Sequence, residues 1–196
     1  MEILIATKNI GKIKEFKGMF ESIGHNVKSL IDFPDITEIE ETGTTFEENA
    51  IIKARKLSRL TGKIVISDDS GLEVDALNGE PGVYSARYAG NNKNDEDNIN
   101  LVLEKLKGVP TEKRTARFIC VIAVVFPTGS TETFKGICEG IITEEKKGNE
   151  GFGYDPIMYI PKLNRTMAEL TKDEKNQISH RGNALRKMLD KMIIFR

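Results

Sequence analysis

The segment that most restricts the fold runs from residue 114 to residue 145, where two long stretches of strand-forming residues flank a turn. Residues 116–126 are apolar at nearly every position, so both faces of a strand there would be buried. The sequence Pro127-Thr128-Gly129-Ser130 is typical of a turn, and the chain can return after it as the second strand of a hairpin. We therefore expect the first strand of this hairpin to be central in a sheet.

Strands and helices alternate before the hairpin, which indicates an α/β protein built on a mixed sheet. Thr45 and Glu48 fit a capping box at the start of one helix, with Thr44 and Glu47 as an alternative register, and Gly62 suits its end. The other strands are expected over residues 1–6, 27–30 and 63–67 and up to Ile160, and the other helices over residues 11–23 and 95–107 and from Ser179 onward.

Composition limits the classes of function. The chain of 196 residues carries 29 Lys and Arg against 30 Asp and Glu. It therefore lacks the excess of positive charge that would indicate a nucleic-acid partner. No apolar stretch reaches the ~18 residues of a membrane span, and the N-terminus lacks the basic segment of a signal peptide. We therefore expect a cytoplasmic protein. If the hairpin closes symmetrically, Cys120 lies opposite Cys138, but reduced thiols are the expected state in the cytosol.

The first candidate site is the run Thr7-Lys8-Asn9-Ile10-Gly11-Lys12 between an expected strand and an expected helix. Backbone N–H groups at a helix N-terminus attract anions, and two lysines add positive charge. The run lacks the spacing of a Walker A loop, because Ala6 and Ile13 occupy positions where that motif needs Gly and Ser or Thr. It indicates a phosphate site, with an ordinary capped helix as the alternative.

Carboxylates form the second candidate. Asp68-Asp69-Ser70-Gly71 follows an expected buried strand, and adjacent carboxylates at that end of a strand can hold Mg²⁺ through oxygen ligands. Two like charges side by side favour a cation over a simple turn. The acidic run Glu38-Ile39-Glu40-Glu41 can add a carboxylate to the same metal, or it can be a solvated loop.

Two further candidates lie in the last third of the chain. In Gly151-Phe152-Gly153-Tyr154-Asp155, glycines beside an aromatic residue let the backbone approach a flat ligand, on which the Phe152 ring can stack. A tight turn with a buried ring is the alternative. Ser179-His180-Arg181, with Lys175 upstream, places cationic groups at a helix N-terminus, where they oppose the helix dipole unless an anion or acceptor faces them.

Taken together and in this order, the motifs closely resemble the inosine triphosphate pyrophosphatase family, whose members are also called XTP/dITP diphosphatases. The resemblance covers essentially the whole chain. It is carried by these residues: Thr7 to Lys12, Glu40-Glu41-Thr42-Gly43 with Phe46 to Ala50, Ser67 to Leu72, Pro81-Gly82-Val83-Tyr84-Ser85-Ala86-Arg87, Gly151 to Pro156, and Ser179 to Gly182.

The resemblance implies a single two-lobed domain over residues 1–196, with a long twisted mixed β-sheet flanked by helices and an active-site cleft between the lobes. It implies Mg²⁺ as cofactor, a homodimer, and hydrolysis of ITP, dITP and XTP to the monophosphate and pyrophosphate. Glu40 and Asp69 would be metal ligands, and Asp69 the catalytic proton acceptor. The substrate would contact Thr7, Lys8, Asn9, Ile10, Gly11, Lys12, Ser70, Phe152, Gly153, Tyr154, Asp155, Lys175, His180 and Arg181.

Two other interpretations stay open at this point. A Maf-like nucleotide pyrophosphatase would share a similar fold but act on pyrimidine or modified-base nucleotides, and the Ser179 to Gly182 sequence argues against it. A regulatory protein that binds nucleotides without catalysis would not need the Asp68-Asp69 and Glu40-Glu41 pairs. Release of pyrophosphate separates these interpretations.

Overall fold

The computed structural model describes residues 2–36 and 39–192, so the expectations for Met1 and Glu38 lie outside the described residues. Contacts divide the chain into two compact units. The first unit comprises Met1–Asp69, Val121–Lys135 and Ala184–Arg196. The second unit comprises Ser70–Cys120 and Gly136–Asn183.

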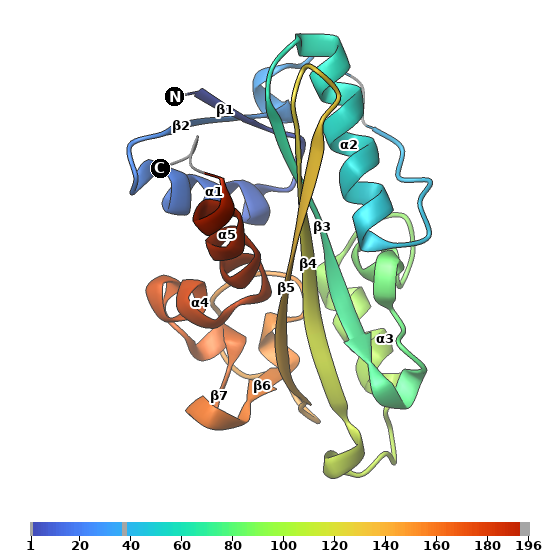
Figure 1. The fold of residues 1–196 in the computed structure, drawn as a ribbon. Helices are drawn as coiled ribbons and strands as arrows, with labels where there is room; N and C mark the ends of the chain where they lie inside the picture. Colours follow the sequence, from blue (N-terminus) through green and yellow to red (C-terminus); the bar gives the residue numbers. More distant parts are fainter. Residues whose placement is uncertain (1, 37–38, 193–196) are drawn as a thin grey trace. The chain divides into compact units, whose positions relative to one another are not determined.

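The described strands form a seven-stranded sheet in the order β2-β1-β3-β4-β5-β6-β7. Its strands run both parallel and antiparallel, which confirms the expected mixed sheet in an α/β chain. β1 (Glu2–Ile5) pairs in parallel with β2 (Asn26–Ser29) and with β3 (Val65–Val74). β4 (Thr115–Val125) and β5 (Thr131–Ile142) form the long hairpin, and β4 stands in the middle of the strand order as expected (Figure 1). The short strands β6 (Met158–Ile160) and β7 (Arg165–Thr166) continue the sheet in antiparallel pairing.

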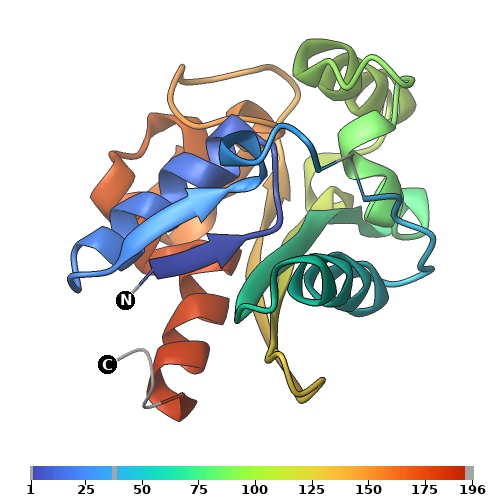
Figure 2. The ribbon, with the colours of Figure 1, turned by 90° about the horizontal axis from the view of Figure 1, so that it is seen from above.

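In the first unit, α1 (Ile10–Glu21) lies against β1 and β2, and α2 (Phe46–Thr61) runs alongside β3 (Figure 2). The apolar side of α1 is fully buried at Phe16 and Phe20, whose rings stack at 6.2 Å. α2 begins as expected at Thr45, whose side chain accepts from the Glu48 amide. The Glu48 carboxylate in turn accepts from the amide of Thr44, so the cap uses both threonines of the two alternative registers.

The second unit contains α3 (Asp95–Lys105) and α4 (Lys172–Ile178), and α5 (His180–Lys191) begins in it. The helix over residues 95–107 and the helix after Ser179 were expected, whereas α4 and β7 were not. α4 carries a local signal all the same, because Thr171 and Glu174 form a complete capping box. The core of this unit is apolar and includes Leu72, Val74, Ile99, Val102, Leu106, Phe118, Ile142, Tyr154, Ile157, Met158 and Met167.

One expectation about β3 was wrong. The strand does not end before Asp68 but continues through Asp68, Asp69, Ser70 and Gly71 to Val74. These residues are typical of turns, yet here they stand in a strand that has β1 and β4 as its neighbours in the sheet. β1 pairs with β3 only at Val65 and Ile66, so β4 is the neighbouring strand that accompanies the rest of β3. Pairing with a neighbouring strand overrides a weak local preference. Because successive side chains of a strand point to opposite faces, the carboxylates of Asp68 and Asp69 lie on different faces of the sheet.

The two cysteines are buried thiols and form no disulfide, as expected. Burial raises the pKa of the Cys138 thiol to about 11, so the reactive thiolate is rare at neutral pH. We expect iodoacetamide at pH 8 to leave Cys138 unmodified in the folded protein and to alkylate it after unfolding in urea. Mass spectrometry of the digested chain measures both states. Fast alkylation of Cys138 in the folded protein would contradict its burial.

Across residues 2–36 and 39–192, no helix is long and apolar enough to cross a membrane.

Candidate active site

The first unit places the Thr7 to Lys12 run at the start of α1, in the geometry expected of an anion site. Asn9 is the N-cap, and its side chain accepts from the Lys12 amide at 3.0 Å. The Asn9 amide donates to the Thr7 hydroxyl at 3.1 Å, which tightens the turn. Ile10 is 55% exposed, so its side chain serves no core. Residues 8–10 are exposed, and they stand at the positive end of a 12-residue helix.

Carboxylates of β3 lie near this turn within the same unit. Lys12 Nζ lies 3.0 Å from Asp68 Oδ2, and the Asp68 side chain is fully buried. Asp69, on the other face of the strand, lies 3.5 Å from the ammonium of Lys53 on α2. Each aspartate therefore has its own lysine, which offsets the repulsion between two neighbouring negative charges.

Lys53 also contacts Glu41, at 2.5 Å from Oε1, and so bridges two carboxylates. Glu40, the expected metal ligand, has an exposed side chain, whereas that of its neighbour Glu41 is partly buried. The Asp69 Oδ2 atom is buried and accepts no hydrogen bond within the described residues. An oxygen in that condition suits a hard cation such as Mg²⁺. No group of three or more His, Cys, Asp or Glu side chains among the described residues is already assembled around a metal position.

Burial decides the charge state of this cluster. Loss of hydration raises the pKa of the Asp69 carboxyl above its usual range, and the positive charges of Lys53 and Lys12 offset only part of that rise. For Lys53 the balance is reversed. Burial lowers the pKa of its ammonium, but the nearby charges of Asp69, Glu41 and Asp68 outweigh this effect and raise the pKa overall. A carboxyl group with a raised pKa is a better proton acceptor than an ordinary aspartate.

We expect Lys53→Met to destabilise the protein by ~3–5 kcal/mol, because it leaves two carboxylates without their shared cation in a buried place. For a chain of this length that loss corresponds to a Tm about 6–20 °C lower. Thermal unfolding followed by circular dichroism measures the shift. Lys56→Met, at an exposed position of the same helix, is the matched control and should stay within ~0.5 kcal/mol of the parent protein. Equal Tm values for both variants would contradict the buried bridge.

The second unit brings together the other expected residues. Asp155 Oδ2 accepts from the Phe152 amide at 2.9 Å and from the Lys175 ammonium at 2.6 Å, and both charged side chains are nearly fully buried. The Lys175 ammonium also lies 4.8 Å from the centre of the Phe152 ring. Gly151 permits this turn, because it has a φ of 79° and a side chain there would collide with the Asp155 carboxylate.

Arg181, at the start of α5, is the largest fully buried side chain described. Its guanidinium donates to the Ser70 hydroxyl at 2.9 Å and lies 5.9 Å from the centre of the Phe152 ring. His180 stacks on Phe118 with ring centres 4.9 Å apart. The second unit thus surrounds an aromatic ring with buried cations and hydroxyl groups, which suits a flat ligand that carries hydrogen-bond acceptors.

Sequence reasoning missed Lys53, although a signal was present. Asn49 and Lys53 lie four residues apart beside the apolar stripe of α2, and both are buried. A lysine on the inward side of an amphipathic helix needs a buried anion. Asn49 caps the approach to the helix, since its side chain accepts from the Gly43 amide at 2.8 Å.

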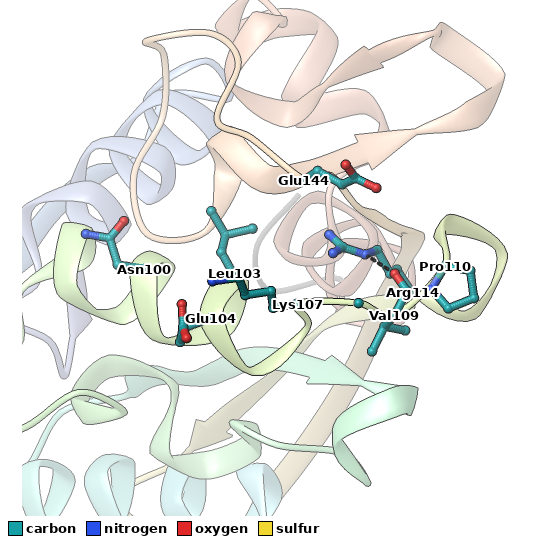
Figure 3. Close-up of a pocket in the computed structure, with 9 residues that line it drawn as sticks. Asn100, Leu103, Glu104, Lys107, Val109, Pro110, Arg114 and Glu144 are labelled. Carbon is teal, nitrogen blue, oxygen red and sulfur yellow. Dashed lines mark hydrogen bonds between the residues drawn. The ribbon is translucent and has the colours of Figure 1, made fainter.

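A separate hollow of about 710 Å³ lies at the C-terminal end of α3 and contains none of the expected site residues (Figure 3). Its buried member is Arg114, whose guanidinium donates to the carbonyl groups of Leu106, Val109 and Thr143. These bonds satisfy the end of a helix, so the arginine has a structural role there.

Comparisons with known proteins agree on one family. Residues 3–191 match the family model described as Ham1 family. A dITP/XTP pyrophosphatase of Bacillus cereus is 57% identical over 193 residues, which are 97% of this chain and 94% of that protein. The structure of the Staphylococcus aureus Ham1 protein has a TM-score of 0.85 at 50% identity and covers 97% of each chain. That of the Mycobacterium abscessus nucleoside-triphosphatase, or dITP/XTP pyrophosphatase, has a TM-score of 0.77 at 45% identity and covers 98% of this chain and 100% of that one.

Proposed function

The chain belongs to the Ham1 family, and on that premise we propose that it hydrolyses non-standard purine nucleoside triphosphates, namely ITP, dITP and XTP, to the monophosphate and pyrophosphate. The activity is that of a hydrolase acting on a phosphoric anhydride. The observation that carries the proposal is full-length similarity to curated dITP/XTP pyrophosphatases. The enzyme would remove damaged nucleotides from the pool.

The cluster of the first unit suits the triphosphate. A triphosphate brings about four negative charges, and the start of α1 offers backbone amides and lysines at one place. Thr7, Lys8, Asn9, Ile10, Gly11 and Lys12 would bind phosphate oxygens. Mg²⁺ would be held by Asp69, with Glu40 as the second ligand that the family motif implies, and when bound it would neutralise charge on the phosphate oxygens and the leaving pyrophosphate. Mg²⁺ commonly uses one or two carboxylates plus phosphate oxygens, so a prebuilt cage of side chains is not required.

Asp69 would accept the proton of the attacking water. Its buried carboxyl group has a raised pKa and an oxygen without a hydrogen-bond partner among the described residues, so it can orient a water and take its proton. The water attacks the α-phosphorus, the bond to the bridging oxygen breaks, and pyrophosphate leaves. Lys53 lies 3.5 Å from Asp69 Oδ1, and Lys12 pairs with the neighbouring Asp68 on the other face of the strand.

The cluster of the second unit suits the base. Phe152 would stack on the purine ring, and Arg181 would donate to the 6-keto oxygen of hypoxanthine or xanthine, with Ser70, Gly153, Tyr154, Asp155, Lys175 and His180 completing the contacts. Arginine has donors and no acceptor. Adenine presents a 6-amino donor, so two donors would face each other in a dry place, which is heavily penalised.

Three finer features complete the proposal. Mg²⁺ is the metal, the active form is a homodimer, and the enzyme works in the cytoplasm. The family resemblance supports the first two features, and two cysteine thiols that form no disulfide suit the reducing cytoplasm. Light scattering of the purified protein at micromolar concentration tests the dimer.

We expect pyrophosphate release from ITP, XTP and dITP to require Mg²⁺ and to exceed release from ATP and GTP. A coupled assay for pyrophosphate with the five nucleotides, with and without EDTA, measures this directly. Preferential turnover of pyrimidine nucleotides would favour a Maf-like activity instead. Nucleotide binding without pyrophosphate release would favour a regulatory protein.

A further inference from the structure

The segment Pro81 to Arg87 is one of the motifs that carry the family resemblance, and it belongs to neither the phosphate cluster nor the base cluster. Its centre is Ser85, which is buried in the short 3-10 helix Gly82–Arg87. The Ser85 hydroxyl accepts from the Leu72 amide of β3 at 2.9 Å and donates to the Gly82 carbonyl at 2.6 Å. Ser85 therefore fastens this helix to β3 two residues beyond Ser70.

Tyr154 connects the same serine to the glycine-rich loop. Its hydroxyl donates to the Ser85 carbonyl at 2.7 Å, and the side chain is 6% exposed. Burial raises the pKa of the Tyr154 phenol, so the hydroxyl is protonated at neutral pH and can donate. The neighbouring Gly153 amide donates to Asp95 Oδ2 at 2.7 Å, which gives the loop a second anchor at the start of α3.

These bonds close a circuit around Phe152. From one side, Leu72 of β3 reaches Ser85, and Ser85 reaches Tyr154, two residues beyond Phe152. From the other side, Ser70 of the same strand accepts from Arg181, whose guanidinium lies 5.9 Å from the Phe152 ring. All these residues belong to the second unit. The two arms of the circuit together fix how far the ring stands from the guanidinium.

We propose that Ser85 and Tyr154 are positioning residues, which hold the Phe152 ring at its distance from Arg181 and thereby set the affinity of the site for the purine base. The Tyr154 hydroxyl acts through the loop, because it bonds the Ser85 carbonyl, and the substrate contact proposed for this residue is left to its backbone. The inference rests on the proposed function, because the base is its ligand. The proposal predicts that loss of either hydroxyl lowers the affinity for the base more than it lowers kcat or the affinity for phosphate groups.

The test uses Tyr154→Phe and Ser85→Ala in the full chain, with Ser85→Thr as the variant that retains the hydroxyl. We expect KM for ITP and Kd for IMP to rise about fivefold to tenfold in the first two variants, the cost of one buried hydrogen bond. The kcat should stay within about twofold. Inhibition by inorganic tripolyphosphate, which has no base, should be unchanged. Ser85→Thr should recover most of the affinity for IMP. The double variant Tyr154→Phe, Ser85→Ala should bind IMP as well as the single variant with the lower affinity.

Tyr88→Phe is the matched control, because it also removes one hydroxyl, which in this case bonds Glu80 at the exposed surface. Hydrogen exchange supplies a readout without any ligand, and residues 151–155 should exchange faster in Tyr154→Phe but not in Tyr88→Phe. Unchanged exchange, or unchanged IMP affinity with only a lower Tm, would overturn the positioning role. An equal loss of tripolyphosphate inhibition would also overturn it. If the parent protein fails to hydrolyse ITP, the proposed function fails, while the exchange comparison still decides the role of Tyr154.

Discussion

Asp69→Asn should lower kcat for ITP on the order of 10²–10⁴-fold while the protein stays folded. The variant keeps the shape of the side chain but removes the negative charge, so it can neither take a proton from water nor hold a cation well. Stability should change little, because the Asp69 carboxyl is already disfavoured as an anion by burial. Lys53 keeps its shorter contact with Glu41 in the variant. Steady-state pyrophosphate release and thermal unfolding, measured on the same preparation, separate the two effects.

Asp75→Asn is the control for the loss of one carboxylate. Asp75 directly follows β3, and its carboxylate contacts Thr115 and Arg117 near the surface. Its kcat should stay within about twofold of the parent protein, since surface substitutions of this kind rarely change stability by more than ~0.5 kcal/mol. An Asp69→Asn protein with undiminished turnover would remove Asp69 from the mechanism proposed above.

Much of the fold followed from hydrophobic pattern and capping residues. The central hairpin, the start of α2 at Thr45 and the start of α5 after Ser179 all carry signals within a few residues of one another. The prediction for β3 was wrong in its C-terminal half, because the interactions that determine that half are not local in the sequence. Its Asp68 to Gly71 residues are turn formers, and pairing with β4, which is distant in sequence, favours the extended form.

The same long-range pairing explains what could not be predicted about the carboxylates. Sequence showed two adjacent aspartates and suggested that they share one cation. In a strand they lie on opposite faces, where Lys12 from α1 meets Asp68 and Lys53 from α2 meets Asp69. The sequence also could not show which glutamate contacts Lys53. Glu40 and Glu41 are adjacent residues of the same type, and only the path of the loop decides which side chain points toward the cluster. The proposed metal role of Glu40 and the contact of Glu41 with Lys53 can be separated by comparing Mg²⁺ dependence in Glu40→Gln and Glu41→Gln.

The choice of base should depend on Arg181. We expect Arg181→Gln to lower kcat/KM for ITP roughly 10–100-fold, the cost of losing a hydrogen bond from a charged donor. A glutamine amide can also accept, so it can pair with the 6-amino group of adenine, which the arginine cannot do. Turnover of ATP should therefore rise relative to that of ITP, and the ratio of their kcat/KM values should shrink by roughly 10²–10³.

Arg117→Gln is the matched control, since its guanidinium pairs with Asp75 and Glu73 at the surface of the same unit. It should leave both kcat/KM values within about twofold, because exposed ion pairs contribute little. The ratio of the two substrates matters more than either rate, because damage to folding lowers turnover of ITP and ATP together. If Arg181→Gln reduces both equally, Arg181 supports the structure around Ser70 and Phe152, and selection of the 6-keto group must come from another donor in the second unit.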